Sequence, residues 1–149
     1  MYKVMFVCLG NICRSPMAEF LMKDIVQKRG REKEFFICSA ATSTEELGNA
    51  PHIGTRKKLA ELGISTVGKT AVQLSKADYA DYDYFLGMET ANIRSILRIF
   101  GGDPEKKVYR LLDFSDCPRD IADPWYTGNF DKTFSDIHEG ITSFLERIQ

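Results

Sequence analysis

The chain has 149 residues, of which 44% are hydrophobic and 28% are charged, a composition typical of one globular domain spanning residues 1–149. Its formal net charge of −1 gives no reason to expect nucleic acid or a membrane surface as a partner. The four cysteines do not resemble a secreted disulfide framework, and the apolar run at the N-terminus suits neither a signal peptide nor a membrane span. We therefore expect a cytoplasmic protein.

The chain opens with a predicted strand, loop and helix. Residues 4–7 are apolar, as in a buried parallel strand, and a helix is expected to follow from Pro16 onward. Ser15 is the predicted cap of that helix, and Pro16 suits its first position, where no amide donor is lost. Residues 8–15 thus join the carboxyl end of a strand to the amino end of a helix, where backbone N–H groups can bind an anion.

The residue types in this loop indicate phosphate chemistry. Cys8 begins the loop and Arg14 ends it, with five residues between them. A curled loop would bring both to one anion, so that the thiolate faces the phosphorus and the guanidinium binds two oxygens. Two other interpretations stay open: Cys8 is a small buried hydrophobe, or Cys8 and Cys13 are metal ligands, although no second Cys/His pair has zinc-site spacing.

The remaining sequence alternates between predicted helices and strands. Apolar residues at helical spacing predict helices over residues 17–29, 52–62 and 130–148, and a further helix with its apolar face at Ile93, Ile96, Leu97 and Phe100. Short apolar runs predict strands over residues 35–38, 84–87 and 108–111. We therefore expect an α/β fold, a three-layer sandwich in which helices flank a four-stranded parallel sheet, doubly wound and flavodoxin-like.

Residues 113–126 form a long predicted loop that contains four aspartates. A calcium site is one interpretation, but the EF-hand spacing is absent, and a solvated acidic loop is another. The segment Asp123-Pro124-Trp125-Tyr126 supports a third. Proline keeps the preceding aspartate extended, so its carboxyl group can be aimed at a site beside two aromatic rings that could enclose a phenyl group.

Four segments of the chain resemble the low-molecular-weight protein tyrosine phosphatases, in the order expected for that family. They are residues 7–16, residues 39–43, the pair Asp83-Tyr84 with Met88, and residues 123–126. The resemblance covers nearly the whole chain. It implies hydrolysis of phosphotyrosine in proteins, with no metal or other cofactor, and it implies that Ser39 hydrogen-bonds near the phosphate loop.

The resemblance also assigns roles to individual residues. Cys8 is the expected nucleophile, favoured as a thiolate by its surroundings, and forms a phosphocysteine intermediate. Arg14 should bind phosphate, Ser15 should donate a hydrogen bond to the Cys8 sulfur, and Asp123 should act as general acid and then as general base. Substrate or phosphate should contact the remaining members of the site: Leu9, Gly10, Asn11, Ile12, Cys13, Trp125 and Tyr126.

The sequence departs from the family pattern at four places, the first of which is Cys38, where the family usually has an acidic residue. Glu45 stands where relatives often carry an aromatic residue, and His52 stands where an aspartate is usual. Many relatives also have a histidine in the stretch 64–74 that steadies the phosphate-loop asparagine, whereas this chain offers Gly68, Lys69, Thr70 and Val72 there. Asn11 must therefore find a different partner, or a water molecule.

Three other functions remain to be weighed. Thioredoxin-coupled arsenate reductases need two more cysteines after residue 75, and residues 75–116 contain none. Protein-arginine phosphatases carry threonine where this chain has Ile12, whose apolar side chain suits an aryl ring better. A non-catalytic phosphotyrosine-binding module would need neither Cys8 nor Asp123.

Cys13 is a candidate for redox control. It lies five residues after Cys8 on a loop that is expected to curl back, so the two sulfurs could form a disulfide after Cys8 is oxidised. The alternative is that Cys13 only packs beneath the loop.

Overall fold

The computed structural model describes residues 1–148, and its centre is a sheet of four parallel strands. The strands are β1 (Tyr2–Cys8), β2 (Phe35–Ala41), β3 (Tyr84–Gly87) and β4 (Val108–Arg110), in the spatial order β2-β1-β3-β4. The predicted four-stranded parallel sheet is confirmed, and β3 has the predicted bounds. Strand β2 runs three residues beyond the predicted end, because its last residues still pair with β1.

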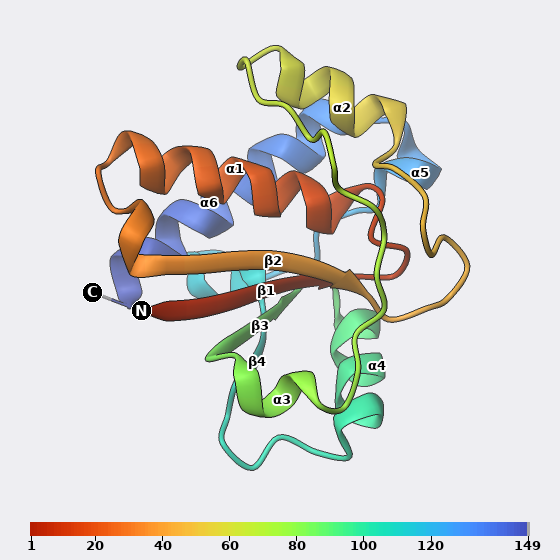
Figure 1. The fold of residues 1–149 in the computed structure, drawn as a ribbon, viewed down its shortest axis with the longest axis vertical. Helices are drawn as coiled ribbons and strands as arrows, with labels where there is room; N and C mark the ends of the chain where they lie inside the picture. The colour runs from red at the N-terminus through yellow and green to blue at the C-terminus, as the bar shows by residue number, and fades with distance from the viewer. Residues whose placement is uncertain (149) are drawn as a thin grey trace.

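Helices cover both faces of the sheet, as predicted for a three-layer sandwich (Figure 1). One face carries α1 (Arg14–Lys28) and α6 (Phe130–Arg147), against which α2 (Ile53–Ala60) also packs. The opposite face carries α3 (Asp78–Asp81) and α4 (Thr90–Phe100). Three short helical turns complete the set: η1 (Glu32–Glu34), η2 (Leu111–Phe114) and α5 (Pro124–Thr127).

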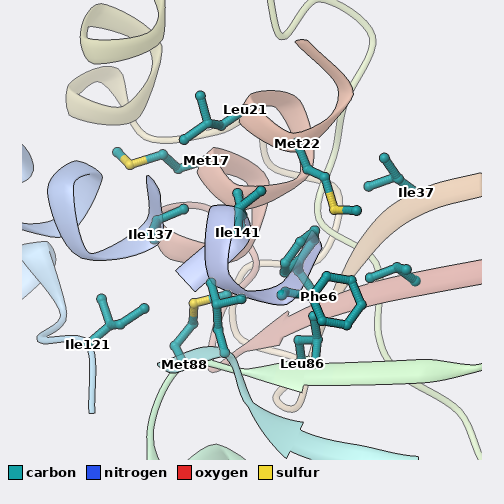
Figure 2. Close-up of a cluster of buried hydrophobic side chains, with 14 of the residues drawn as sticks. Phe6, Met17, Leu21, Met22, Ile37, Leu86, Met88, Ile121, Ile137 and Ile141 are labelled. Atoms are coloured by element: carbon teal, nitrogen blue, oxygen red, sulfur yellow. The ribbon is translucent and has the colours of Figure 1, made fainter. Parts of the chain in front are cut away.

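The sequence of β1 is almost continuously apolar, and the position of the strand inside the sheet explains why. Successive side chains of a strand point to opposite faces, and both faces of this central strand are covered. Val4 and Phe6 belong to the core beneath α1 and α6, whereas Met5 and Val7 belong to the smaller core beneath α4. Figure 2 shows Phe6 in the larger core, among aliphatic and methionine side chains from α1, α6, β2 and β3. The carboxyl end of β1 is thereby fixed on a rigid base.

The first turn of α1 differs from the prediction. The helix begins at Arg14, Cys13 is its N-cap residue without a side-chain hydrogen bond, and Ser15 and Pro16 lie inside the first turn. The prediction that Ser15 caps the helix is therefore wrong, because the helix begins two residues earlier and the Ser15 hydroxyl contacts the Cys8 sulfur instead. Pro16 is tolerated within the first turn, where its missing N–H would have no helical partner.

None of the helices within residues 1–148 combines the length and the apolar character that crossing a bilayer requires.

Candidate active site

The loop between β1 and α1 curls around the sulfur of Cys8. Asn11 adopts a φ of 58°, a left-handed conformation that asparagine tolerates better than most residues. Its backbone N–H donates to Cys8 Sγ over 3.3 Å. The curl also brings Ser15 back to the start of the loop, with Ser15 Oγ 3.0 Å from Cys8 Sγ. Both polar contacts converge on a thiol that is almost completely buried.

The direction of the Ser15 hydrogen bond follows from its neighbours. Asn11 Nδ2 donates to Ser15 Oγ over 2.7 Å, so this hydroxyl acts as an acceptor toward Asn11. Its own proton is then free to point at the Cys8 sulfur. A hydrogen bond from a hydroxyl to sulfur favours the thiolate over the thiol, because a thiolate is the stronger acceptor.

Arg14 lies at the opposite end of the loop, with its side chain only 3% exposed. Its Nη1 donates to the carbonyl oxygen of Ile121 over 2.8 Å and also pairs with the carboxylate of Glu89. Its Nη2 lies 3.4 Å from Asp123 Oδ2. These contacts fix the plane of the guanidinium, which is needed if it is to present two N–H groups to two oxygens of one anion.

Glu89 is a site residue that the sequence analysis missed. It follows β3 after Met88, so it lies at the carboxyl edge of the sheet beside the loop that follows β1. Ligands of open α/β sheets bind at that edge, so the position of Glu89 just after β3 could have identified it as a candidate site residue. The ion pair between Glu89 and Arg14 could not be predicted from sequence spacing, because the two residues are 75 positions apart.

Asp123 is held in the extended conformation that Pro124 was predicted to impose, with φ −79° and ψ 116°. It is the N-cap of α5, and its Oδ1 accepts a hydrogen bond from the Trp125 N–H over 3.0 Å. The other carboxylate oxygen, Oδ2, faces Arg14. One short turn therefore aims the carboxyl group at the phosphate loop.

A cleft opens above the loop, and most of the predicted site residues line it. Its lining consists of Cys8, Leu9, Gly10, Ile12, Cys13, Arg14, Glu45, Glu46, Asp123, Trp125 and Tyr126. The predicted site residues Asn11 and Ser15 are instead fully buried beneath it. Glu45 and Glu46 form one wall of the cleft, so this wall is acidic at the position where an aromatic residue is common in the family.

The aromatic side of the cleft is exposed. Trp125 is 55% exposed and Tyr126 is 78% exposed. The ring of His52 meets the Trp125 ring edge-on at a centroid distance of 5.5 Å and stacks on Phe130. His52 is also the N-cap of α2, where its Nδ1 accepts the Gly54 N–H over 2.9 Å. His52, which stands where an aspartate is usual in the family, is half-buried at this helix start and supports the aromatic wall.

Cys13 lies in the floor of the cleft and is buried. Burial, together with the nearby charges of Asp123 and Cys8, raises the pKa of the Cys13 thiol to about 12. Cys13 is therefore a neutral thiol at physiological pH.

Beneath the loop, Asn11 has three hydrogen-bond partners in place of the missing histidine. Its Nδ2 donates to Ser39 Oγ over 2.9 Å as well as to Ser15, and its Oδ1 accepts the backbone N–H of Val72 over 3.2 Å. The expected hydrogen bond between Ser39 and the loop region is thus present. Ser39 in turn donates to Glu19, a buried carboxylate that the sequence analysis did not single out.

Within residues 1–148, no group of three or more histidine, cysteine, aspartate and glutamate side chains is arranged to hold a metal ion. Two of the four aspartates considered for calcium, Asp113 and Asp120, pair instead with Arg110.

The cleft lies where a strand passes through a curled loop into a helix, and a cysteine, an arginine and an aspartate line it together. This arrangement is typical of phosphate-binding proteins with a cysteine nucleophile. Comparison with known proteins makes the assignment specific: the model of the family described as low molecular weight phosphotyrosine protein phosphatase matches residues 3–149. The chain belongs to this family of hydrolases.

Individual relatives agree with the family model. The low molecular weight protein-tyrosine-phosphatase YfkJ of Bacillus subtilis is 42% identical, over 100% of this chain and 97% of the relative. PtpA of Staphylococcus epidermidis is 36% identical, over 99% of this chain and 94% of the relative. The crystal structure of YfkJ has a TM-score of 0.94 to this fold and covers 100% of this chain and 95% of its own.

The same fold occurs in a relative named for a different phosphorylated residue. The crystal structure of a Drosophila arginine phosphatase has a TM-score of 0.91 and is 27% identical, over 99% of this chain and 98% of the other.

Proposed function

We propose that this protein hydrolyses phosphotyrosine in proteins, and aryl phosphate monoesters generally, through a phosphocysteine intermediate on Cys8. The observation that carries the proposal is the convergence of Cys8, Arg14 and Asp123 on one cleft. A nucleophile, a phosphate-binding cation and a proton donor are the three groups that the reaction needs. We place this single-domain enzyme in the cytoplasm, where a reactive thiol is kept reduced.

In the first step the phosphoryl oxygens bind the loop N–H groups and the Arg14 guanidinium. The Cys8 thiolate attacks phosphorus, so that a sulfur–phosphorus bond forms while the bond from phosphorus to the phenolic oxygen breaks. Asp123, in its protonated form, donates its proton to the leaving oxygen, which would otherwise depart as a phenolate. The developing charge on the equatorial oxygens is met by Arg14 and the backbone donors.

In the second step water attacks the phosphocysteine. The Asp123 carboxylate accepts a proton from the water, the sulfur–phosphorus bond breaks, and Cys8 leaves as a thiolate that Ser15 stabilises. Inorganic phosphate is the product. Every charge that develops in the two steps is matched by a protein group, so the proposed mechanism uses no metal ion.

The lining of the cleft favours an aryl substrate. Ile12 presents an apolar side chain beside the loop, and Trp125 and Tyr126 offer aromatic faces at the rim. A flat ring can stack between such groups, whereas a phosphoguanidinium group is polar over its whole length. Because one structural relative is an arginine phosphatase, phosphoarginine is the second substrate to be assayed.

The covalent step is tested with wild type and Cys8→Ser. We expect rapid-quench experiments on wild type to trap phosphate on Cys8, and we expect Cys8→Ser to abolish turnover while still binding inorganic phosphate. Near-normal hydrolysis by Cys8→Ser would contradict the mechanism. Parallel assays with phosphotyrosine, phosphoarginine, and arsenate plus thioredoxin would then separate the proposed activity from its alternatives.

A further inference from the structure

The hydrogen bonds beneath the phosphate loop run outward from the Asn11 amide, toward Glu19 on one side and toward Cys8 on the other. Glu19 Oε1 accepts the Ser39 hydroxyl proton over 2.6 Å, so Ser39 Oγ faces Asn11 as an acceptor. Asn11 Nδ2, which as an amide nitrogen can only donate, supplies its two protons to Ser39 and to Ser15. Ser15 accepts from Asn11 and keeps its own proton for Cys8. The acceptor at the far end, Glu19, fixes the Ser39 oxygen that holds the Asn11 amide beside Ser15.

Glu19 can begin this chain only as a carboxylate. A protonated Glu19 could donate to Ser39, and the Ser39 hydroxyl could then rotate, so that its oxygen would no longer be fixed as the acceptor for Asn11. The residue is 5% exposed, and a carboxylate at such a depth needs a cation to offset the lost hydration.

Two lysines supply positive charge to Glu19 from different environments. Lys23 Nζ lies 2.6 Å from Oε2, but its side chain is 45% exposed and lies on the same helix, one turn away. Lys69 Nζ lies 3.6 Å from Oε1, and its side chain is only 12% exposed. Screening by water weakens the first pair more than the second, so Lys69 is the more effective partner for its charge.

Lys69 is also held in place by the backbone. Its Nζ donates to the carbonyl oxygen of Ser39 over 2.9 Å. Strand β2 lies at the edge of the sheet, and residues 64–74 run past its end between α2 and α3 (Figure 1). Backbone bonds from Ala41 to Val72 and from Leu74 to Ala41, of 2.7 and 2.8 Å, fasten this stretch to β2. The ammonium group therefore sits between the strand that carries Ser39 and the carboxylate that Ser39 contacts.

We propose that Lys69 is a positioning residue for Cys8: it keeps Glu19 an acceptor, so that Ser39 holds the Asn11 amide in place and Asn11 holds Ser15 with its proton toward the sulfur. The inference rests on the proposed function and adds a residue outside the cleft. Lys69 should therefore stabilise the sulfur in the two states in which it carries negative charge. These are the free thiolate, and the second step, when Cys8 is the leaving group. Binding of the phosphate itself depends on the loop N–H groups and Arg14, and should change little.

The test compares Lys69→Met with Lys23→Met, which removes the other cation from the same carboxylate. For Lys69→Met we expect the pH profile of Cys8 alkylation by iodoacetamide to move upward by roughly one pH unit, the equivalent of a tenfold weaker stabilisation of the thiolate. Breakdown of the phosphoenzyme should slow by about tenfold, the loss expected for one charge-assisted hydrogen bond, with KM little changed. Lys23→Met should have a smaller effect on both, and Lys69→Arg should restore part of each.

Two further variants distinguish the proposed role of Lys69 from misfolding caused by an unpaired buried charge. Glu19→Gln removes the acceptor charge, and the double variant Glu19→Gln/Lys69→Met removes both charges, so neither is left buried without a partner. We expect the double variant to be no worse than Glu19→Gln alone, because both changes break the same chain. Additive defects in the double variant would overturn the inference. Equal effects of Lys69→Met and Lys23→Met would also overturn it. So would an alkylation profile of Lys69→Met that is the same as that of wild type. Alkylation needs no turnover, so these outcomes stay readable even if wild type forms no phosphoenzyme and the proposed function fails.

Discussion

The phosphate loop and the Asp123–Tyr126 segment meet at one cleft but are built in opposite ways. The loop follows a strand that is covered on both faces, and its buried polar side chains are tied to partners from four other segments. The Asp123–Tyr126 segment is the cap and most of a four-residue helical turn, and both of its aromatic rings are mostly exposed. The half that holds the anion is preorganised, whereas the half that meets the leaving group is only lightly anchored.

Arg14 joins the two regions. It contacts the backbone of Ile121, the carboxylate of Glu89 and the carboxylate of Asp123. If the comparison is right, changes in the buried half should affect every phosphate ester alike. Changes in the exposed half should depend on the identity of the leaving group.

The largest effect is expected at Asp123. Phenol has a pKa of about 10, so phosphotyrosine needs a proton from the enzyme as the bond breaks, and general-acid help of this kind is worth about 10²–10⁴-fold. Asp123→Ala should slow phosphoenzyme formation by that order for phosphotyrosine and much less for nitrophenyl phosphate, whose leaving group is more acidic. Single-turnover rates for a series of aryl phosphates would give a steep dependence on leaving-group pKa in the variant and a shallow one in wild type.

Asp123→Asn is the matched control for that experiment. The amide oxygen can still accept the Trp125 N–H and cap α5, but the side chain cannot deliver a proton. It should therefore behave like Asp123→Ala in the leaving-group series. Parallel lines for wild type and both variants would mean that Asp123 only shapes the loop.

A smaller effect, confined to oxidising conditions, is expected at Cys13. Peroxide should convert the Cys8 thiolate to a sulfenic acid, and the Cys13 thiol should then condense with it to form a disulfide and release water. Because the pKa of Cys13 is raised to about 12, Cys13 stays protonated at neutral pH and Cys8 is oxidised first. Dithiothreitol should restore activity after peroxide in wild type and much less in Cys13→Ser.

Cys38→Ser controls for loss of a thiol elsewhere. Cys38 lies on β2 and is partly buried, and burial raises its pKa as well. This variant should recover like wild type. Equal recovery in all three proteins would remove the protective role of Cys13 and leave it as a residue packed beneath the loop.

The smallest effect is expected at Trp125. One aromatic contact contributes about 0.5–1.5 kcal/mol beyond its buried area, so Trp125→Ala should raise KM for phosphotyrosine by about 2–10-fold. Inhibition by inorganic phosphate, which contacts only the loop, should not change. Trp125→Phe keeps a ring and should recover most of the loss.

Trp125 also provides a direct measurement, because it is the only tryptophan in the chain. Its fluorescence should change when an aryl phosphate binds to Cys8→Ser and should change little with inorganic phosphate. Identical responses to the two ligands would argue against a ring beside Trp125.

The parts of the fold and of the site that depend on neighbouring residues were predictable from the sequence. The apolar run of β1, the bounds of β3 and the extended Asp123 before Pro124 all follow from contacts within a few residues. The capping rule failed at Ser15, because it considers the helix alone and the loop uses the hydroxyl for the Cys8 sulfur. Glu89, Glu19 and Lys69 escaped prediction for another reason: their partners are distant in the sequence and meet only when the sheet edge is assembled.

The backbone of Asn11 has a consequence for which sequences this fold accepts. A φ of 58° favours glycine, asparagine and aspartate over most other residues. Glycine would relax the turn but has no side chain to donate to Ser15 and Ser39, and aspartate has no proton to give and adds a negative charge beneath the bound anion. One amino acid therefore satisfies both the steric and the hydrogen-bonding demand. A chain with this topology and a different residue at this position is expected to lose either the left-handed turn of the loop or the hydrogen bond that holds Ser15 beside the sulfur.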